Sequence, residues 1–356
     1  MKLLHVVGAR PNFMKVSPVW WAIAKETEIN QSLIHTGQHY DINMSDVFFS
    51  ELDLCEPDEY LGVGSGTHAE QTAAILVAME KVISQYKPDL VMVYGDVNST
   101  MAASLVCAKL LIPVGHVEAG LRSFDRTMPE EINRVITDQI AELLFTPSKD
   151  GNENLIREGV SSEKIHLVGN VMIDTLVKLL PKAEMIPAEE FSEPYALVTL
   201  HRPSNVDHGE TLHAIIESLI DISNSLQVIF PVHPRTRQQI EEFELEIPDN
   251  DRLQLVEPMG YLDFLALHLR ATVVITDSGG VQEEATYLGV PCLTVRENTE
   301  RPVTVTVGTN SLVGRDMRLL KRKVASIIAG NAKKGKLPPL WDGEAAIRIA
   351  RILDCL

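Results

Sequence analysis

Cysteine is scarce in this chain, which has four cysteines among 356 residues and no Cys-x-x-Cys pair. Their scatter gives no sign of a zinc site or a disulfide framework and is typical of a reducing compartment. No apolar run approaches the roughly 20 residues of a membrane-spanning helix. The N-terminal apolar run is too short for a signal peptide. The sequence therefore predicts a cytoplasmic protein.

Positive charge is also scarce, since the chain has 32 lysines and arginines but 49 aspartates and glutamates. The formal net charge of −17 argues against nucleic acid or an anionic membrane as a partner. Any anionic ligand then needs a locally basic pocket. With 45% hydrophobic residues the chain can form a large core, and its length favours two domains.

Signatures of cofactor and metal sites are missing. Neither Gly8-Ala9-Arg10 nor Gly62-Val63-Gly64 is the Gly-x-Gly-x-x-Gly fingerprint of a dinucleotide site, so a nicotinamide enzyme is not indicated. No His-Glu-x-x-His or aspartate-rich metal signature occurs either. Metal binding is therefore the weaker interpretation of the polar clusters.

Short β-branched or apolar runs alternate with helical periodicity along the chain, which predicts parallel sheets covered by helices. We expect strands at residues 3–7, 32–36, 90–94, 113–117, 143–146, 195–200, 227–232, 253–256, 273–276 and 291–295. We expect helices at 13–25, 45–52, 68–85, 129–140, 211–222, 317–329 and 341–356, with Asn98 or Ser99, Ser278 and Asp342 as candidate helix caps. An acidic, proline-containing stretch at 181–194 lies close to the expected domain boundary.

The two halves of the chain follow a similar plan. Val91-Met92-Val93-Tyr94-Gly95-Asp96 precedes a helix and then Ile112-Pro113-Val114, as Val273-Val274-Ile275-Thr276-Asp277 precedes a helix and then Val290-Pro291-Cys292. We infer two Rossmann-like domains facing each other across a cleft, although any two Rossmann-like units show a similar sequence pattern. Ligands of these sheets bind at the carboxyl ends of the strands.

Ser278-Gly279-Gly280 stands between an expected buried strand and an expected helix. The glycines allow backbone N–H groups at the helix start to approach a phosphate. Glu284 follows about 9 Å along the helix axis, where its carboxylate could accept a hydrogen bond from a sugar hydroxyl. An ordinary capped helix with surface acids explains this stretch equally well.

Asp96, Glu118 and Glu130 are the candidate general acids and bases. Asp96 and Glu118 follow successive expected strands, and Glu130 opens a helix after Pro129. Acids that converge at one sheet edge can serve in this way if their environments separate their pKa values. Glu130 alone is better explained as an ordinary first-turn acid. A charge that ends a buried strand, as Glu118 does, needs a partner, which favours a functional role.

Basic side chains form a second set, and nearly all of them lie in expected loops at strand ends. The set contains Arg10, Lys15, His201, Arg202, His233, Arg235 and Arg301. In so acidic a chain these groups make a plausible binding region for a diphosphate. A lone histidine is usually structural, but His201 and His233 recur at matching strand ends.

Several runs between Gly8 and Pro302 carry a family resemblance. They are Gly8-Ala9-Arg10-Pro11, Thr36-Gly37-Gln38-His39, Gly95-Asp96-Val97-Asn98-Ser99-Thr100, His116-Val117-Glu118-Ala119-Gly120-Leu121-Arg122, Pro129-Glu130-Glu131-Ile132-Asn133-Arg134, Val168-Gly169-Asn170, His201-Arg202, Ser278-Gly279-Gly280-Val281-Gln282-Glu283-Glu284 and Thr299-Glu300-Arg301-Pro302. Together they resemble the non-hydrolysing UDP-N-acetylglucosamine 2-epimerases.

The resemblance implies a glycosyltransferase-B fold of two Rossmann-like domains. The first domain would comprise residues 1–169 with 342–356, because the last helix crosses back to it, and would carry the acid/base residues. The second, at 170–341, would bind UDP. The resemblance further implies a homodimer that supplies N-acetylmannosamine-type sugars for surface polysaccharide.

The resemblance also implies a mechanism without a cofactor. UDP is eliminated across C1–C2 of the sugar, and it adds back to the 2-acetamidoglucal after C2 is protonated on the other face. Asp96, Glu118, Glu130 and His201 would be the active-site groups. UDP would bind through Arg10, Ser278, Gly279, Gly280, Glu284 and Arg301, with Ser278 to Gly280 at the pyrophosphate and Glu284 at the ribose.

Two departures from the family pattern leave alternatives open. Ser204 stands where many relatives have Glu, and Tyr40-Asp41 where many bacterial relatives have Arg-Glu. The second departure puts in doubt the activation by a second substrate molecule that some family members show. A related UDP-sugar as substrate, a hydrolysing epimerase, a UDP-sugar glycosyltransferase and a UDP-sugar-binding regulator are the competing hypotheses.

Overall fold

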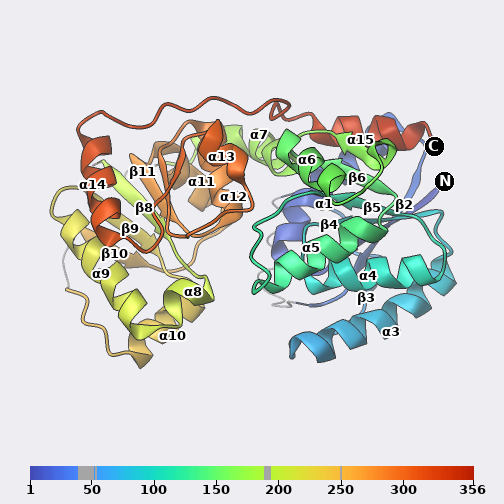
Figure 1. Cartoon of the computed structure of the whole chain (residues 1–356), viewed down its shortest axis with the longest axis horizontal. Helices are drawn as coiled ribbons and strands as arrows, with labels where there is room; N and C mark the ends of the chain where they lie inside the picture. Colours follow the sequence, from blue (N-terminus) through green and yellow to red (C-terminus); the bar gives the residue numbers. More distant parts are fainter. Residues whose placement is uncertain (39–51, 53, 188–193, 249–250) are drawn as a thin grey trace. The chain divides into compact units, whose positions relative to one another are not determined.

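The computed structural model describes residues 1–38, 52, 54–187, 194–248 and 251–356. The predicted helix at 45–52, apart from Leu52, and the run His39-Tyr40-Asp41 lie outside these residues. The chain divides into two compact units, Met1–Lys178 with Pro339–Leu356 and Leu179–Pro338 (Figure 1). Among the helices of the described residues, none is both long and apolar enough to cross a membrane.

The first unit contains a parallel sheet in the order β3-β2-β1-β4-β5-β6-β7. Its strands are β1 (Lys2–Val7), β2 (Asn30–His35), β3 (Glu59–Tyr60), β4 (Leu90–Tyr94), β5 (Val114–Val117), β6 (Leu143–Thr146) and β7 (Ile165–Leu167). Every residue of β4 and β5 is buried, as expected for central strands that are covered on both faces. All five strands predicted here are confirmed within two residues at each end.

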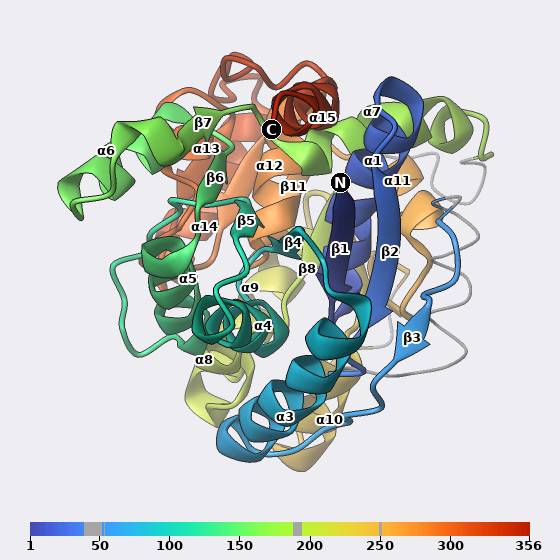
Figure 2. The same ribbon diagram turned by 90° about the vertical axis from the view of Figure 1, so that its right-hand side faces the viewer.

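Helices cover both faces of this sheet. They are α1 (Arg10–Glu26), α3 (His68–Tyr86), α4 (Asn98–Lys109), α5 (Pro129–Ile140), α6 (Lys149–Arg157), α7 (Val171–Glu184), which runs on into the second unit, and α15 (Ala345–Asp354), with a short 3₁₀ turn at Ser162–Lys164. Figure 2 shows α3, α4 and α5 together on one side and α1 with α15 on the other. The predicted caps of α4 are wrong, because Val97 occupies the cap position and Asn98 and Ser99 are its first helical residues.

The second unit repeats the arrangement with the order β10-β9-β8-β11-β12-β13, again all parallel. Its strands are β8 (Tyr195–Thr199), β9 (Gln227–Pro231), β10 (Leu253–Val256), β11 (Val273–Thr276), β12 (Cys292–Thr294) and β13 (Asn310–Leu312). Its helices are α8 (Pro203–Val206), α9 (Gly209–Ser223), α10 (Pro234–Glu242), α11 (Tyr261–Arg270), α12 (Gly279–Leu288), α13 (Pro302–Thr306) and α14 (Met317–Ile328).

Side chains of β8 alternate between the two faces of this sheet. Ala196 and Val198 pack in the core under α9 and α14, whereas Tyr195 and Leu197 pack against residues of α11 and α12. This period of two is what a strand covered on both faces requires. Both sheets thus share the doubly wound order, with β4 and β11 in equivalent places. This confirms the similarity between the two halves that the sequence indicated.

The C-terminal helix α15 belongs to the first unit and packs against α1, as the resemblance implied. It starts later than predicted, because Asp342 lies outside it and pairs with Arg348. Asp174 of α7 accepts hydrogen bonds from the first backbone N–H groups of α15, at 3.2 Å from Ala345 N and 2.6 Å from Ala346 N. Burial raises the pKa of Asp174 to about 6 despite these bonds.

Candidate active site

In the first unit, two loops meet where the strand order reverses between β1 and β4. Asn12 joins them, since its side-chain oxygen accepts from Gly8 N at 2.9 Å and its amide donates to Tyr94 O at 2.8 Å. A Cβ on Gly8 would lie 2.1 Å from Ser99 Oγ, so only glycine fits there. The loops that carry Arg10 and Asp96 are therefore fixed to each other. The side chain of Arg10 is outside the described part of the structure.

Glu118 follows β5 and is buried, with 7% of its surface exposed. It forms an ion pair with Lys15, which is 6% exposed. Gly95 lies against both groups, because a Cβ there would be 2.6 Å from Lys15 Nζ and 3.2 Å from Glu118 Oε2. Glu118 also has a left-handed backbone with φ of 77°, a conformation that a non-glycine residue adopts only when its surroundings impose it. The structure thus holds this carboxylate and its cation in one position.

Asp96 follows β4, the strand next to β5, and its side chain is 27% exposed. It forms an ion pair with the buried Arg134 of α5. Asn133 donates to the backbone oxygen of Asp96 at 2.9 Å. Asp96 and Glu118 therefore share one sheet edge, as predicted, and each has its own buried basic partner.

The two first-turn acids of α5 have different environments. Glu131 is 2% exposed and accepts from Ser123 N and Phe124 N, both at 2.9 Å, and from Arg134 Nη1 at 2.7 Å. Glu130 is exposed, and no hydrogen bond or ion pair of its side chain is found among the described residues. The structural role belongs to Glu131, and the Glu130 carboxylate remains accessible at the helix start.

A buried network behind this edge was not predicted to have a role. His116 of β5 lies 2.8 Å from the Gly95 carbonyl oxygen and 2.7 Å from Asp138 Oδ1, and Arg122 donates to Asp138 Oδ2 at 2.7 Å. Burial by itself would raise the pKa of Asp138, but His116 and Arg122 outweigh burial and keep it below its usual value. Only the polar character of His116 within a buried strand signalled this network in the sequence.

In the second unit, Asp277 organises the corresponding sheet edge between β8 and β11. Its buried carboxylate accepts from the backbone N–H groups of His201 and Arg202, at 3.1 and 3.0 Å, and from Asn205 Nδ2 at 3.0 Å. Its Oδ1 also lies 3.2 Å from His201 Nδ1. Burial alone would raise the pKa of Asp277, but the hydrogen bonds from His201, Arg202 and Asn205 outweigh it and lower the pKa. The His201 ring is thereby oriented with Nε2 directed away from Asp277.

The start of α12 keeps its hydrogen-bond donors available. Ser278 occupies the N-cap position, as predicted, although its side chain makes no capping hydrogen bond. The first N–H groups of a helix have no intrahelical acceptor, and they carry partial positive charge. Open donors beside two glycines are the arrangement that an anion-binding helix start needs.

Buried ion pairs surround this helix start. Arg301 Nε lies 2.8 Å from Glu283 Oε1, and Arg296 Nη2 lies 2.7 Å from Glu300 Oε2. Burial would raise the pKa of Glu300, but the arginines around it, Arg296 above all, outweigh burial and hold the pKa far below its usual value. Arg301, a predicted UDP-binding residue, is therefore held next to α12 by Glu283.

The remaining predicted basic residues lie at the ends of β8 and β9. His233 is exposed, and its ring centroid is 5.6 Å from that of His201. Arg235 is exposed and donates to Asp207 Oδ1 at 2.8 Å. The structure thus brings His201 and His233 together, whereas Arg235 is directed towards Asp207.

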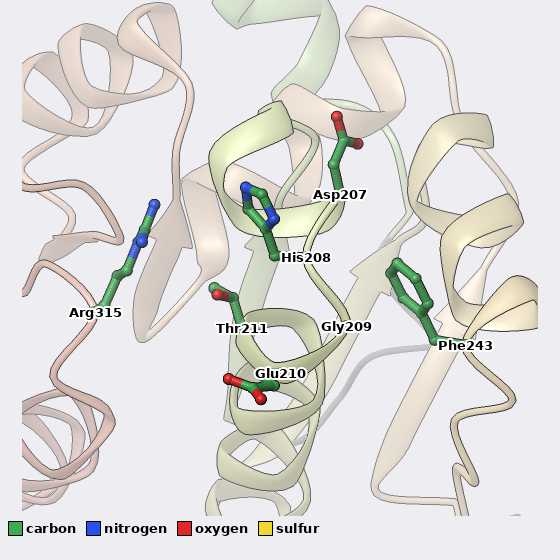
Figure 3. A pocket seen from close by; sticks show the side chains of 7 residues that line it. All are labelled: Asp207, His208, Gly209, Glu210, Thr211, Phe243 and Arg315. Carbon is green, nitrogen blue, oxygen red and sulfur yellow. The ribbon is translucent and has the colours of Figure 1, made fainter.

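A pocket of about 490 Å³ lies beside Asp207 at the start of α9. Figure 3 shows His208, Glu210 and Thr211 along the helix start, with Arg315 on one side and Phe243 on the other. None of the predicted site residues lines it. No group of three or more potential metal-ligating side chains occurs within the described ranges.

Gly279→Ala should weaken binding of a diphosphate by about 5- to 150-fold, because strain of about 1–3 kcal/mol is typical of an inserted methyl group. A Cβ at this position would lie 2.6 Å from Glu300 Oε1, and ion pairs with the buried Arg296 and the half-buried Arg202 hold Glu300 in place. Isothermal titration with UDP measures the effect. Gly209→Ala is the matched control, since Gly209 also begins a helix and its Cβ would find its nearest atom at 3.5 Å. Equal UDP affinity in both variants would contradict a ligand at α12.

Comparisons with known proteins agree with this geometry. A family profile described as UDP-N-acetylglucosamine 2-epimerase matches residues 21–354. A Methanocaldococcus jannaschii protein named UDP-N-acetylglucosamine 2-epimerase is 46% identical over 99% of each chain. A Pseudomonas aeruginosa protein named UDP-2,3-diacetamido-2,3-dideoxy-D-glucuronate 2-epimerase is 42% identical over 99% of each chain. The crystal structure of the M. jannaschii UDP-GlcNAc 2-epimerase in complex with UDP-GlcNAc and UDP matches with a TM-score of 0.93 and 46% identity over 100% of each chain. The predicted α/β class, a glycosyltransferase-B-like fold with two domains, is confirmed.

Proposed function

The chain belongs to the UDP-N-acetylglucosamine 2-epimerase family, and we propose that it interconverts UDP-N-acetylglucosamine and UDP-N-acetylmannosamine. A base removes the C2 proton of the sugar as the C1–O bond to UDP breaks, which leaves a 2-acetamidoglucal. An acid then protonates C2 on the opposite face, and UDP adds back to C1. The reaction is balanced without an oxidant or a reductant. The protein therefore needs only to transfer protons at C2 and to hold UDP until it adds back.

The observation that carries this proposal is the pair Asp96 and Glu118 at the ends of adjacent strands, each beside its own buried cation. Epimerisation needs two proton-transfer groups, one for each face of C2. We assign these roles to Asp96 and Glu118. Glu130 is the third candidate, and its exposed carboxylate at the start of α5 can reach a ligand.

The leaving group is proposed to bind to the second unit. The open N–H groups of Gly279 and Gly280 suit the pyrophosphate, as does the Ser278 hydroxyl, which makes no capping bond. Arg301 adds positive charge beside them. Asp277 orients the His201 ring so that Nε2 is directed away from Asp277, where the imidazolium form of the ring would donate to a diphosphate oxygen, and His233 lies next to it. Glu284 would hold the ribose. Arg10, Lys15 and Arg235 complete the proposed set of substrate-binding residues.

Incubation with UDP-GlcNAc in D₂O tests the proposal directly. We expect UDP-ManNAc to form and one deuterium to enter C2 of both nucleotide sugars, followed by proton and carbon NMR. Release of free N-acetylmannosamine together with UDP would indicate a hydrolysing epimerase instead. Absence of C2 deuteration from a full panel of UDP-N-acetylhexosamines would contradict epimerisation.

A second candidate substrate is a UDP-sugar that carries additional groups on the ring. The named Pseudomonas aeruginosa relative, 42% identical, is called an epimerase of a diacetamido glucuronate, so family membership alone does not fix the sugar. The same deuterium assay separates the two candidates when UDP-GlcNAc and the UDP-diacetamido sugar acid are compared by kcat/KM. The substrate with the higher kcat/KM is the better assignment.

The wider role is a further part of the proposal. We propose a cytoplasmic homodimer that supplies N-acetylmannosamine-type sugars for surface polysaccharide. Light scattering of the purified chain measures the oligomeric state.

A further inference from the structure

Glu284 of α12 makes its contacts with two residues of the neighbouring helix α11. It is 3% exposed, and Tyr261 Oη donates to its Oε1 at 2.9 Å. His268 Nδ1 lies 3.5 Å from its Oε2, which is beyond a good hydrogen bond. Tyr261 and His268 are seven residues apart, so they lie on the same side of α11. One carboxylate oxygen is thus held by the protein, and the other accepts no hydrogen bond from the described residues.

The environment of Tyr261 keeps its hydroxyl a donor to Glu284. Burial raises the pKa of Tyr261 well above its usual value, and Glu284 raises it further, so the phenol remains a donor. A carboxylate rotates less freely when one of its oxygens already accepts a hydrogen bond. The remaining oxygen therefore suits a ligand that brings its own O–H group.

His268 has an environment that needs an explanation. It is fully buried, and within the described structure neither ring nitrogen has a hydrogen-bond partner. Its ring packs edge-on against Phe264 at 5.8 Å between centroids. A buried polar group without a partner costs about 1–3 kcal/mol, so such groups persist where they serve a site. The ring fills the space beside Oε2 and limits rotation of the carboxylate away from the ligand.

We propose that Tyr261 and His268 are positioning residues that orient Glu284 for a ribose hydroxyl and so set the preference for a ribonucleotide over a deoxyribonucleotide. The inference rests on the proposed function, because it takes Glu284 as the group that meets the ribose. Neither residue touches the reacting carbon of the sugar. Their effect is therefore on nucleotide affinity and not on proton transfer at C2.

The test is a comparison of UDP with 2′-deoxy-UDP and 3′-deoxy-UDP, titrated calorimetrically into the full chain and its variants. The wild type should bind UDP about tenfold more tightly than at least one deoxy analogue, since a lost hydrogen bond to a charged group is worth about 1.5 kcal/mol or more. Tyr261→Phe should weaken UDP binding while changing the affinity for that analogue much less, so the ratio of the two affinities falls towards one. His268→Leu should lower the same ratio.

Tyr195→Phe is the matched control. Tyr195 is also buried, and its hydroxyl donates to the carbonyl oxygen of Leu267 in α11 at 2.6 Å, but it makes no contact with Glu284. This variant removes a hydroxyl bonded to the same helix, and it should leave the affinity ratio unchanged. If Tyr261→Phe does not fold, His268→Leu carries the same comparison.

The outcomes separate this inference from the proposed function. If Tyr261→Phe and His268→Leu weaken UDP and both analogues equally, the two residues act on folding alone and the inference is wrong. If the wild type binds all three nucleotides equally while C2 deuteration proceeds, the epimerase stands and the inference fails. If the wild type neither binds UDP nor exchanges deuterium, both are overturned.

Discussion

Asp96→Asn is expected to lower kcat for epimerisation by roughly 10²–10⁴-fold, the range typical of a lost general acid or base. An asparagine amide can still accept from Arg134 through its oxygen, so the ion pair is replaced by a hydrogen bond of similar shape. The amide cannot carry the proton to or from C2. UDP affinity should stay as in the wild type, because Asp96 is not among the proposed nucleotide-binding residues. Deuterium incorporation at C2 and calorimetric titration with UDP measure the two effects separately.

Asp89→Asn provides the control for this variant. Asp89 directly precedes the same strand β4 at its amino end, is exposed, and accepts from Lys2 N at 2.7 Å. The two variants make the same chemical change beside one strand, at opposite ends. Turnover should survive in Asp89→Asn and be lost in Asp96→Asn. Equal turnover in both would move the proton-transfer role from Asp96 to Glu118 or Glu130.

The central strands were predictable because their local chemistry decides them, whereas the short edge strands β3, β7 and β13 were missed. β4 and β11 are continuous β-branched or apolar runs that end in glycine or aspartate, and parallel sheets bury both faces of such strands. Once the strands are known, parallel order puts Asp96 and Glu118 at a common edge. This part of the site follows from sequence without knowledge of any side-chain contact.

The partners of these acids were not predictable, because they come from distant positions. Lys15 is 103 residues from Glu118, and Arg134 is 38 residues from Asp96. The hydrophobic periodicity of a sequence does not indicate which distant charged residues form ion pairs. The same limit explains why Glu130 and Glu131 could not be ranked from sequence, since only the fold shows that Glu131 is the one bonded to Ser123 and Arg134.

Helix boundaries were the least predictable feature. Asn98 and Ser99 looked like caps, yet their side chains bond instead across the unit, Asn98 to Gln71 at 2.8 Å and Ser99 to Gln38 at 2.7 Å. These tertiary bonds outweigh a cap, which is worth only about 1 kcal/mol. The sequence likewise showed Asp277 only as a residue between an expected strand and an expected helix, although it organises a loop through bonds from residues more than 70 positions away.

Asp277→Ala should therefore destabilise the second unit by about 3 kcal/mol, because it removes a buried charge that several donors require. The N–H groups of His201, Arg202 and Asn205 would lose their acceptor together, and the His201 ring would lose its orientation. The pKa of Asp277 lies below its unfolded value, so its stabilising contribution is present at neutral pH and is lost as the pH falls through the folded pKa. Urea unfolding monitored at neutral pH measures the loss.

Asp221→Ala separates this effect from the loss of any aspartate in the same unit. Asp221 is exposed and pairs with Lys321 at 2.6 Å, a type of ion pair that contributes less than about 1 kcal/mol. The difference between the two variants should vanish at acid pH, where protonation removes the charge of Asp277 in the wild type as well. UDP affinity should fall only in Asp277→Ala, since His201 and the start of α12 both adjoin Asp277. A variant that loses stability but keeps full UDP affinity would show that this loop supports the fold and takes no part in binding the nucleotide.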